Sequence, residues 1–152
     1  MERSTLEETM DMALDQARAA ATAAEVPIGA VLLDPDGAVV AMDHNRTEEL
    51  SDPTAHAEML VIRAAAKAAG SWRLDDHTLV VTLEPCPMCA MAAVWARLGM
   101  VAYGAADLKA GGMQSLYNIG GDKRLNHRLE IIDGVKAEEA GSLLSDFFEA
   151  RR

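Results

Sequence analysis

Two apolar segments on either side of a helical stretch constrain the fold of this chain most strongly. Residues 78–83 form an apolar run typical of a buried strand, and residues 100–103 form a second one. Pro85 and Pro87 end the first run, and residues 88–98 favour a helix that stops before a glycine. Strands joined by helices in this way are typical of a layered α/β sheet.

The remaining segments extend the same pattern. Turn residues at 34–37 separate two apolar runs, which predicts a β-hairpin and one antiparallel strand pair. Asp52-Pro53-Thr54 predicts a helix start, and Gly70 predicts its end. The chain of 152 residues has the length of one domain, 1–152. The expected elements are helices near 3–24, 52–70, 88–98 and 136–152, strands near 28–33, 38–42, 78–83, 100–103 and 129–132, and a glycine-rich loop at 109–121.

Composition excludes several classes of protein. No apolar run reaches the roughly 18 residues that a membrane helix needs, and the charged N-terminal segment lacks the apolar centre of a signal peptide. We therefore expect a cytoplasmic protein that does not enter a membrane. The net charge of −10 argues against nucleic-acid binding over the whole surface. Acidic residues dominate residues 1–36, whereas residues 107–130 are locally neutral to basic.

Two short motifs carry the candidate chemistry: His56-Ala57-Glu58 and Pro85-Cys86-Pro87-Met88-Cys89. The second motif places two thiols about one helical turn apart, which suits a single tetrahedral metal ion. A lone C-x-x-C pair could equally be a redox pair or half of a structural zinc site. The His-Ala-Glu motif favours catalytic zinc, because H-x-E followed by P-C-x-x-C is a signature of zinc-dependent nucleobase deaminases.

The number of ligands favours a catalytic over a structural metal site. His56, Cys86 and Cys89 make three protein ligands, which leaves a fourth tetrahedral position for water. Glu58 lies two residues from a ligand, so it can reach that water and shuttle its proton without binding the metal. The other histidines are expected to be surface or hydrogen-bonding residues, and they are His44, His77 and His127.

Further sequence blocks resemble the bacterial tRNA-specific adenosine deaminases of the cytidine-deaminase superfamily. The resemblance covers roughly residues 25–152. It rests on the two zinc motifs, on Glu25-Val26-Pro27-Ile28-Gly29-Ala30 and Asn45-Arg46, and on four further blocks that point to the tRNA branch of that superfamily. These four blocks are Asp52-Pro53-Thr54, Asp107-Leu108-Lys109-Ala110-Gly111, Asn126-His127-Arg128 and Leu144-Ser145-Asp146-Phe147-Phe148.

The resemblance implies a fold, a reaction and partners. It implies a three-layer α/β/α cytidine-deaminase-like fold with a central five-stranded mixed sheet, and one zinc ion per subunit. The implied reaction converts adenosine to inosine at the wobble position of a tRNA anticodon, so the implied partner is a tRNA anticodon stem-loop. The implied zinc ligands are His56, Cys86 and Cys89, the implied proton shuttle is Glu58, and the implied substrate-binding residues are Asn45, Asp107 and Phe148.

Two alternatives and one departure remain beside this interpretation. The chain could deaminate a free base or nucleoside, such as guanine or cytidine, or it could be a non-catalytic zinc-stabilised RNA-binding module. The departure is Gly111-Gly112-Met113-Gln114, which differs from the small-residue loop expected before Ser115. A homodimer is expected, both from the resemblance and because residues 88–98 are apolar on nearly every side.

Overall fold

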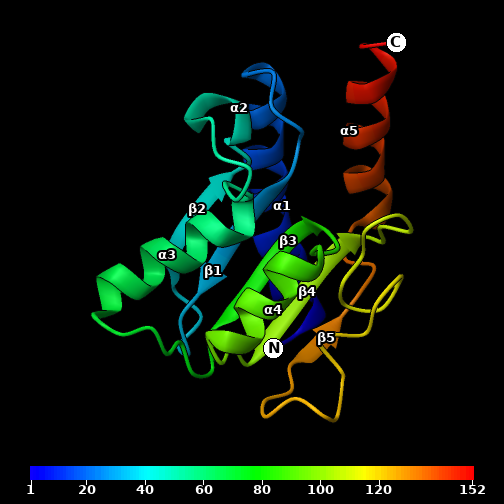
Figure 1. Ribbon diagram of the computed structural model, residues 1–152. Coiled ribbons are helices and arrows are strands. Elements are labelled where there is room, and N and C mark those ends of the chain that lie inside the picture. The colour runs from blue at the N-terminus through cyan, green and yellow to red at the C-terminus, as the bar shows by residue number, and fades with distance from the viewer.

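The computed structural model describes residues 1–152 and contains a five-stranded mixed sheet between two layers of helices (Figure 1). The strand order is β2-β1-β3-β4-β5, in which β1 pairs antiparallel with β2 and β3, and β4 pairs parallel with β3 and β5. This architecture confirms the expected three-layer α/β/α fold. The elements are α1 (Arg3–Thr22), β1 (Gly29–Leu33), β2 (Val39–His44), α2 (Thr47–Leu50), α3 (Ala57–Ala69), β3 (Thr78–Leu83), α4 (Pro87–Trp95), β4 (Met100–Ala105), β5 (Glu130–Ile132) and α5 (Ala137–Glu149).

The sheet separates two hydrophobic cores, because side chains alternate between its faces along each strand. On β1, Ala30 and Leu32 join the core beneath α3 and α4, whereas Val31 and Leu33 join the core beneath α1 and α5. Strands β3 and β4 alternate in the same way. Since both faces of these strands are buried, they appear in the sequence as continuous apolar runs.

Helix α1 packs so closely on β1 that only glycine fits at the contact. A Cβ atom on Gly29 would lie 2.0 Å from the carbonyl oxygen of Ala13 in α1. Ala13 and Ala17 are fully buried on this face of the helix. The alanine-rich face of α1 therefore lets the helix backbone approach the sheet. This close contact also fixes the short segment between α1 and β1, which contains Val26 and Ile28.

One predicted helix boundary is wrong. Asp52-Pro53-Thr54 forms a tight turn instead of a helix start, because Asp52 Oδ1 accepts hydrogen bonds from both the backbone N–H and the hydroxyl of Thr54. Helix α3 begins at Ala57, after His56 in an extended N-cap conformation (φ −73°, ψ 150°). The short helix α2 was also absent from the sequence prediction. None of the helices combines the length and the apolar character that crossing a membrane requires.

Candidate active site

Three potential metal ligands from two helix N-termini lie together. His56 is the N-cap residue of α3 and Cys86 is the N-cap residue of α4, while Cys89 lies in the first turn of α4. His56 Nδ1 is 3.6 Å from Cys86 Sγ and 3.5 Å from Cys89 Sγ. All three ligand atoms lie within 4.8 Å of one another. The fold therefore brings together residues that are 30 positions apart in the sequence.

The spacing of these donor atoms fits a tetrahedral zinc ion. Bond lengths of about 2.3 Å to sulfur and about 2.0 Å to nitrogen, at a tetrahedral angle, would place nitrogen and sulfur about 3.6 Å apart. The two observed nitrogen–sulfur distances agree with this value. His56, Cys86 and Cys89 are therefore suited to hold one zinc ion, and the set leaves one tetrahedral position without a protein ligand.

The surroundings of the two cysteines favour a thiolate at the cluster. The pKa of the Cys86 thiol is lowered to about 4, mainly by a hydrogen bond from Cys89, with a further contribution from His56. The pKa of Cys89 is raised, because its thiol donates that hydrogen bond and is buried. The α4 N-terminus adds a positive dipole end beside both sulfurs. Both sulfurs are therefore placed where they can ligate a cation.

Glu58 is a buried carboxylate beside the three ligands. Its side chain is only 3% exposed, and Oε1 is the one buried side-chain polar atom without a hydrogen-bond partner. Burial raises the pKa of the Glu58 carboxyl to about 7, although a backbone hydrogen bond and the nearby His56 oppose the shift. An unpartnered buried carboxylate costs folding free energy. Such a group in the first turn of α3, close to the ligands, is suited to exchange a proton with a bound molecule.

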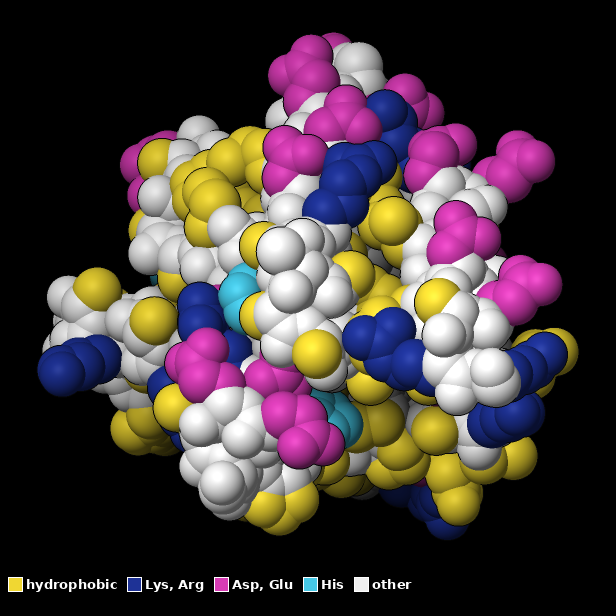
Figure 2. All heavy atoms as spheres, turned by 90° about the horizontal axis from the view of Figure 1, so that it is seen from above, with side chains coloured by type: hydrophobic (Ala, Val, Ile, Leu, Met, Phe, Trp, Pro, Cys, Tyr) yellow, Lys and Arg dark blue, Asp and Glu magenta, His cyan; other side chains and the backbone are white.

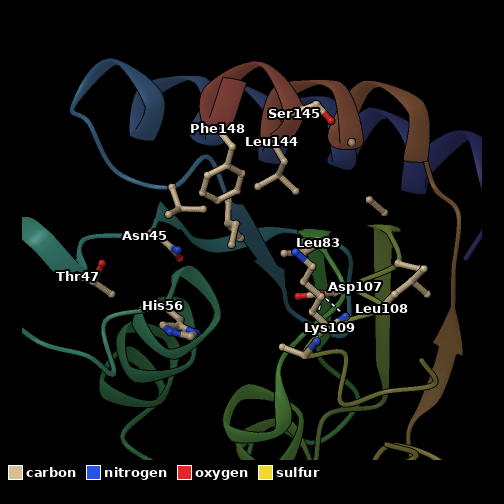
Figure 3. A pocket seen from close by; sticks show the side chains of 16 residues that line it. Asn45, Thr47, His56, Leu83, Asp107, Leu108, Lys109, Leu144, Ser145 and Phe148 are labelled. Carbon is tan, nitrogen blue, oxygen red and sulfur yellow. Dashed lines mark hydrogen bonds between the residues drawn. The ribbon is translucent and has the colours of Figure 1, made fainter. Parts of the chain in front are cut away.

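A cavity of about 680 Å³ opens above this cluster, with His56 on its wall. Figure 3 shows Leu144 and Phe148 of α5 pointing into the cavity from one side, Asn45 and His56 from a second side, and Asp107 to Lys109 from a third. Most of the lining is apolar, including Val26, Ile28 and Leu83. A largely apolar cavity with a few polar groups is typical of a small-molecule or nucleobase site.

The face around the cavity carries mixed charge. Figure 2 looks down on the end of the molecule where α2 and the C-terminal part of α5 lie. Figure 2 shows most acidic side chains along one edge of this face, and basic, acidic and hydrophobic side chains mixed over the rest. Phe148, which lines the cavity, has 48% of its surface exposed. The opening of the cavity is therefore not a uniformly basic surface.

Asn45 has a structural contact and a position on the cavity wall. Its Oδ1 accepts a hydrogen bond of 2.8 Å from the backbone N–H of Ala57, which satisfies one of the free donors of the α3 N-terminus. The residue is 95% buried yet lines the cavity. Because its oxygen is engaged, the side-chain NH₂ group is the part of Asn45 that remains for a ligand.

Asp107 and Phe148 lie on the cavity wall in different surroundings. Asp107 Oδ1 accepts hydrogen bonds from the backbone N–H groups of Lys109 and Ala110, so the carboxylate shapes its own loop. Phe148 packs edge-on against Phe147, with ring centroids 5.4 Å apart. Phe147 is buried and Phe148 is half exposed, as expected from their adjacent positions on a helix. The outer ring face of Phe148 is thus available to an aromatic ligand.

The three other histidines lie apart from the cluster. Each directs a ring nitrogen to a backbone carbonyl oxygen, at 2.7 to 3.0 Å. These contacts agree with the expectation that none of the three is a metal ligand. The pairs are His44 with Asn45, His77 with Asp75, and His127 with Leu98.

Comparison with known proteins places this geometry in a family. Residues 3–105 match the cytidine and deoxycytidylate deaminase zinc-binding region. The tRNA-specific adenosine deaminase of Bacillus subtilis is 48% identical over 94% of this chain and 88% of its own length. The enzyme of the same name from Haemophilus influenzae is 42% identical over 96% of this chain and 84% of its own length. This chain belongs to the tRNA-specific adenosine deaminase family. The family lies within the zinc-binding deaminases that the matched region defines.

A solved structure from work on A-to-I editing by tRNA:A34 deaminases at the wobble position of transfer RNA has a similar fold. It matches this deaminase with a TM-score of 0.87 and 44% identity, over 90% of this chain and 99% of that one. The match spans nearly the whole length of both chains. The two proteins therefore share the same fold over most of this chain.

Two buried glutamates hold the walls of the cavity in the deaminase, and the sequence analysis assigned no role to either of them. Glu25 accepts hydrogen bonds from the backbone N–H groups of Glu48 and Glu49 and from the Thr47 hydroxyl, which anchors α2. Burial alone raises the pKa of Glu25, but these hydrogen bonds outweigh it, so the net pKa is lowered. Glu84 holds the opposite wall. One sequence feature could have indicated these two residues. Each is an acidic residue next to an apolar segment, Glu25 just after α1 and Glu84 just after β3.

Proposed function

We propose that residues 1–152 form one zinc-dependent deaminase domain that converts adenosine to inosine at the wobble position of a tRNA anticodon. The single observation that carries this proposal is the His56–Cys86–Cys89 cluster with the unpartnered carboxylate of Glu58, beside a largely apolar cavity that His56 lines. The names of the relatives at 42–48% identity support the same reaction and substrate. Transfer RNA as substrate also supports a cytoplasmic location.

The proposed reaction replaces the exocyclic amine of adenine by oxygen. Water adds at C6 of the purine, the C6–N bond breaks, and the amine leaves as ammonia. A zinc ion held by His56, Cys86 and Cys89 would act as a Lewis acid and would make the attacking water more acidic. Glu58 accepts one proton from the attacking water and delivers it to N1 of the ring. It then transfers a second proton, from the new C6 hydroxyl, to the departing amine. The side-chain contacts of Glu58 leave Oε1 free for this exchange.

We propose that the walls of the cavity hold a flipped nucleoside. The NH₂ group of Asn45 is the donor that faces this space once its oxygen is bound to Ala57. Phe148 offers a half-exposed aromatic ring for a neighbouring base of the anticodon loop, since every base has a face that can stack. Asp107 lies on the opposite wall, where it approaches the sugar and phosphate of the bound loop.

Phosphate contacts are expected to be few and local. In the segment from 107 to 128, Arg124 pairs with Asp122, whereas Lys109, Lys123 and Arg128 form no salt bridge. Of these three, only Lys109 lines the cavity. Arg128 follows Asn126 and His127, which contact Arg97 and Leu98 just beyond the C-terminal end of α4, away from the metal ligands. Recognition that relies on base flipping and stacking needs less positive charge than recognition of the duplex backbone.

The decisive test is mass analysis of an anticodon stem-loop after incubation with zinc-loaded protein. Replacement of an amine by oxygen is expected to raise the mass of the oligonucleotide by about one dalton, at the wobble adenosine only. Free adenosine, cytidine and guanine are assayed in parallel. Turnover of a free base or nucleoside without turnover of the stem-loop would favour a small-molecule deaminase. Tight RNA binding with zinc present and no ammonia release would favour a non-catalytic module.

We also propose that the protein is a homodimer joined through the outer faces of α3 and α4. Trp72 is 62% exposed and Trp95 is 64% exposed, and both border a shallow apolar groove with Ile62 and Ala92. Two exposed tryptophans beside one groove form an apolar patch typical of a protein interface. A second copy of the chain is the occupant that the apolar α4 helix favours.

Substitution of Trp95 tests this assembly. In sedimentation at micromolar concentration, the native protein is expected to be a dimer and Trp95→Glu a folded monomer, because a charge would be buried at the centre of the interface. Val39→Glu places the same charge on the exposed edge strand β2 and is expected to leave the dimer intact. A native protein that sediments as a monomer would contradict the proposal.

A further inference from the structure

The carboxylate of Glu84 accepts hydrogen bonds from several residues of the loop that follows β4. It is 1% exposed and lies immediately after β3, two residues before Cys86. Oε1 accepts a hydrogen bond from the backbone N–H of Asp107 and one from the Ser115 hydroxyl. Oε2 accepts hydrogen bonds of 2.8 to 3.1 Å from three consecutive backbone N–H groups, those of Met113, Gln114 and Ser115. One side chain thus binds both ends of the segment from 107 to 115.

Two glycines let the loop close over this carboxylate. A Cβ atom on Gly111 would lie 2.5 Å from Glu84 Oε1, so no larger residue fits between them. A Cβ atom on Gly112 would lie 2.7 Å from the backbone nitrogen of Pro87, and the Gly112 N–H donates to the Pro85 carbonyl oxygen. Both glycines are therefore required by the close approach of the loop to Glu84 and to the cysteine motif.

The loop that Glu84 holds forms one wall of the cavity. Residues 105–110 line it, and Asp107 binds Glu84 through its backbone while its own carboxylate organises Lys109 and Ala110. Glu84 itself is not among the cavity-lining residues. Burial raises the pKa of Glu84, but its hydrogen bonds outweigh that effect and lower the pKa, so the group is a charged acceptor at neutral pH. Its influence on a ligand must therefore pass through the loop.

We propose that Glu84 is a positioning residue that fixes the 105–110 wall against the RNA substrate, without acting on the metal or the transferred proton. The inference rests on the proposed deamination of an anticodon loop. The ligands and Glu58 are held by α3 and α4, which make no hydrogen bond to the Glu84 side chain. Loss of the carboxylate should consequently weaken substrate binding and leave the metal centre in place.

Glu84→Gln is the sharpest variant, because it keeps the shape and removes one acceptor. The amide oxygen satisfies the three donors at Oε2 best, which turns the amide NH₂ group toward the N–H of Asp107. Two donors then face each other at the start of the cavity wall, and Asp107 is released. Gly111→Ala disturbs the same contact from the loop side. Ser115→Ala removes a single donor and leaves the carboxylate and its backbone donors.

The experiment measures KM and kcat on an anticodon stem-loop, zinc content, and tryptic cleavage after the exposed Lys109. Glu84→Gln and Gly111→Ala are expected to raise KM about tenfold and to speed cleavage at Lys109, with kcat changed less than about threefold. One zinc ion per chain should remain. Ser115→Ala should change KM by less than about threefold. Asp34→Asn, which weakens a carboxylate that accepts two backbone hydrogen bonds in a remote turn, should change none of these values.

Three outcomes overturn the inference. The first is an unchanged KM and unchanged cleavage in Glu84→Gln, and the second is loss of zinc with a fall in kcat at constant KM. The third is the same loss of affinity in Asp34→Asn, which would indicate a general effect of instability. Failure of the native protein to deaminate the stem-loop overturns the proposed function instead, and cleavage at Lys109 still reports whether Glu84 holds the wall.

Discussion

Replacing Glu58 with glutamine is expected to lower kcat for the stem-loop by about 10³-fold while one zinc ion per chain is retained. Glutamine fills the same space but cannot accept and return a proton. Glu58 is not one of the three clustered ligands, and its Oε1 makes no hydrogen bond that the fold depends on. Zinc content by elemental analysis and single-turnover rates on the same preparation measure the two halves of the prediction.

The interpretation of this variant needs two comparisons. Glu7→Gln changes an exposed acid on α1 and is expected to have native activity and native zinc content. Because a neutral amide costs less to bury than a carboxylate, Glu58→Gln is also expected to resist thermal unfolding at least as well as the native protein. An active Glu58→Gln protein, or one that is inactive because it lacks zinc, would contradict the role of proton shuttle.

Cys86→Ala is expected to abolish stoichiometric zinc binding and to reduce activity by about 10³-fold or more. Only His56 and Cys89 would remain as ligands, and two ligands do not hold zinc against competition from buffer and water. The ion joins the N-termini of α3 and α4, so its loss should also lower the unfolding temperature. Treatment of the native protein with a strong chelator should produce a similar decrease.

Met88→Ala is the matched control, because Met88 lies between the two cysteines in the same turn of α4 and is not a ligand. It is expected to keep its zinc. The double variant Cys86→Ala with Glu58→Gln should be no less active than Cys86→Ala alone, since the shuttle has no function without the metal. Full zinc occupancy in Cys86→Ala, or additive losses in the double variant, would show that the two groups do not act in one centre.

Elements built from periodic apolar residues were predictable from the sequence. Strand β3 lies at residues 78–83 as predicted, and α1, α4 and α5 end within a few residues of their expected limits. Each of these elements buries a face whose period is visible in the chain. The three-layer arrangement and the five-stranded sheet came from the family resemblance, because strand order depends on contacts between distant residues.

Local hydrogen bonding by polar side chains explains the errors. The aspartate and proline near residue 52 resemble a helix start, yet Asp52 binds Thr54 and forms a turn. Helix α2 has only four residues and no buried side chain, so it leaves no apolar pattern. Its backbone is fixed by Glu25, which lies more than twenty positions earlier in the chain. No rule based on local sequence connects an acidic side chain with backbone N–H donors so far along the chain.

The chemistry of the site was more predictable than its walls. The three expected ligands meet in space, and Glu58 lies beside them, because short motifs at helix N-termini determine their positions. Asn45, Asp107 and Phe148 all lie on the cavity, although their roles toward RNA are still proposals. Glu84 was missed because its partners are backbone amides of a loop, and backbone donors have no signature in the sequence.

The mixed charge at the cavity end has a consequence for how such a protein behaves among bulk RNA. Polyphosphate chains bind proteins largely by releasing condensed counterions, and that gain requires many cations on one face. A surface that carries acids as well as bases, on a chain with a net charge of −10, offers little of this gain, so ribosomal RNA should compete poorly even at great excess. Residence on RNA would then depend on a base entering the cavity, and affinity should decline only gently as potassium chloride is added.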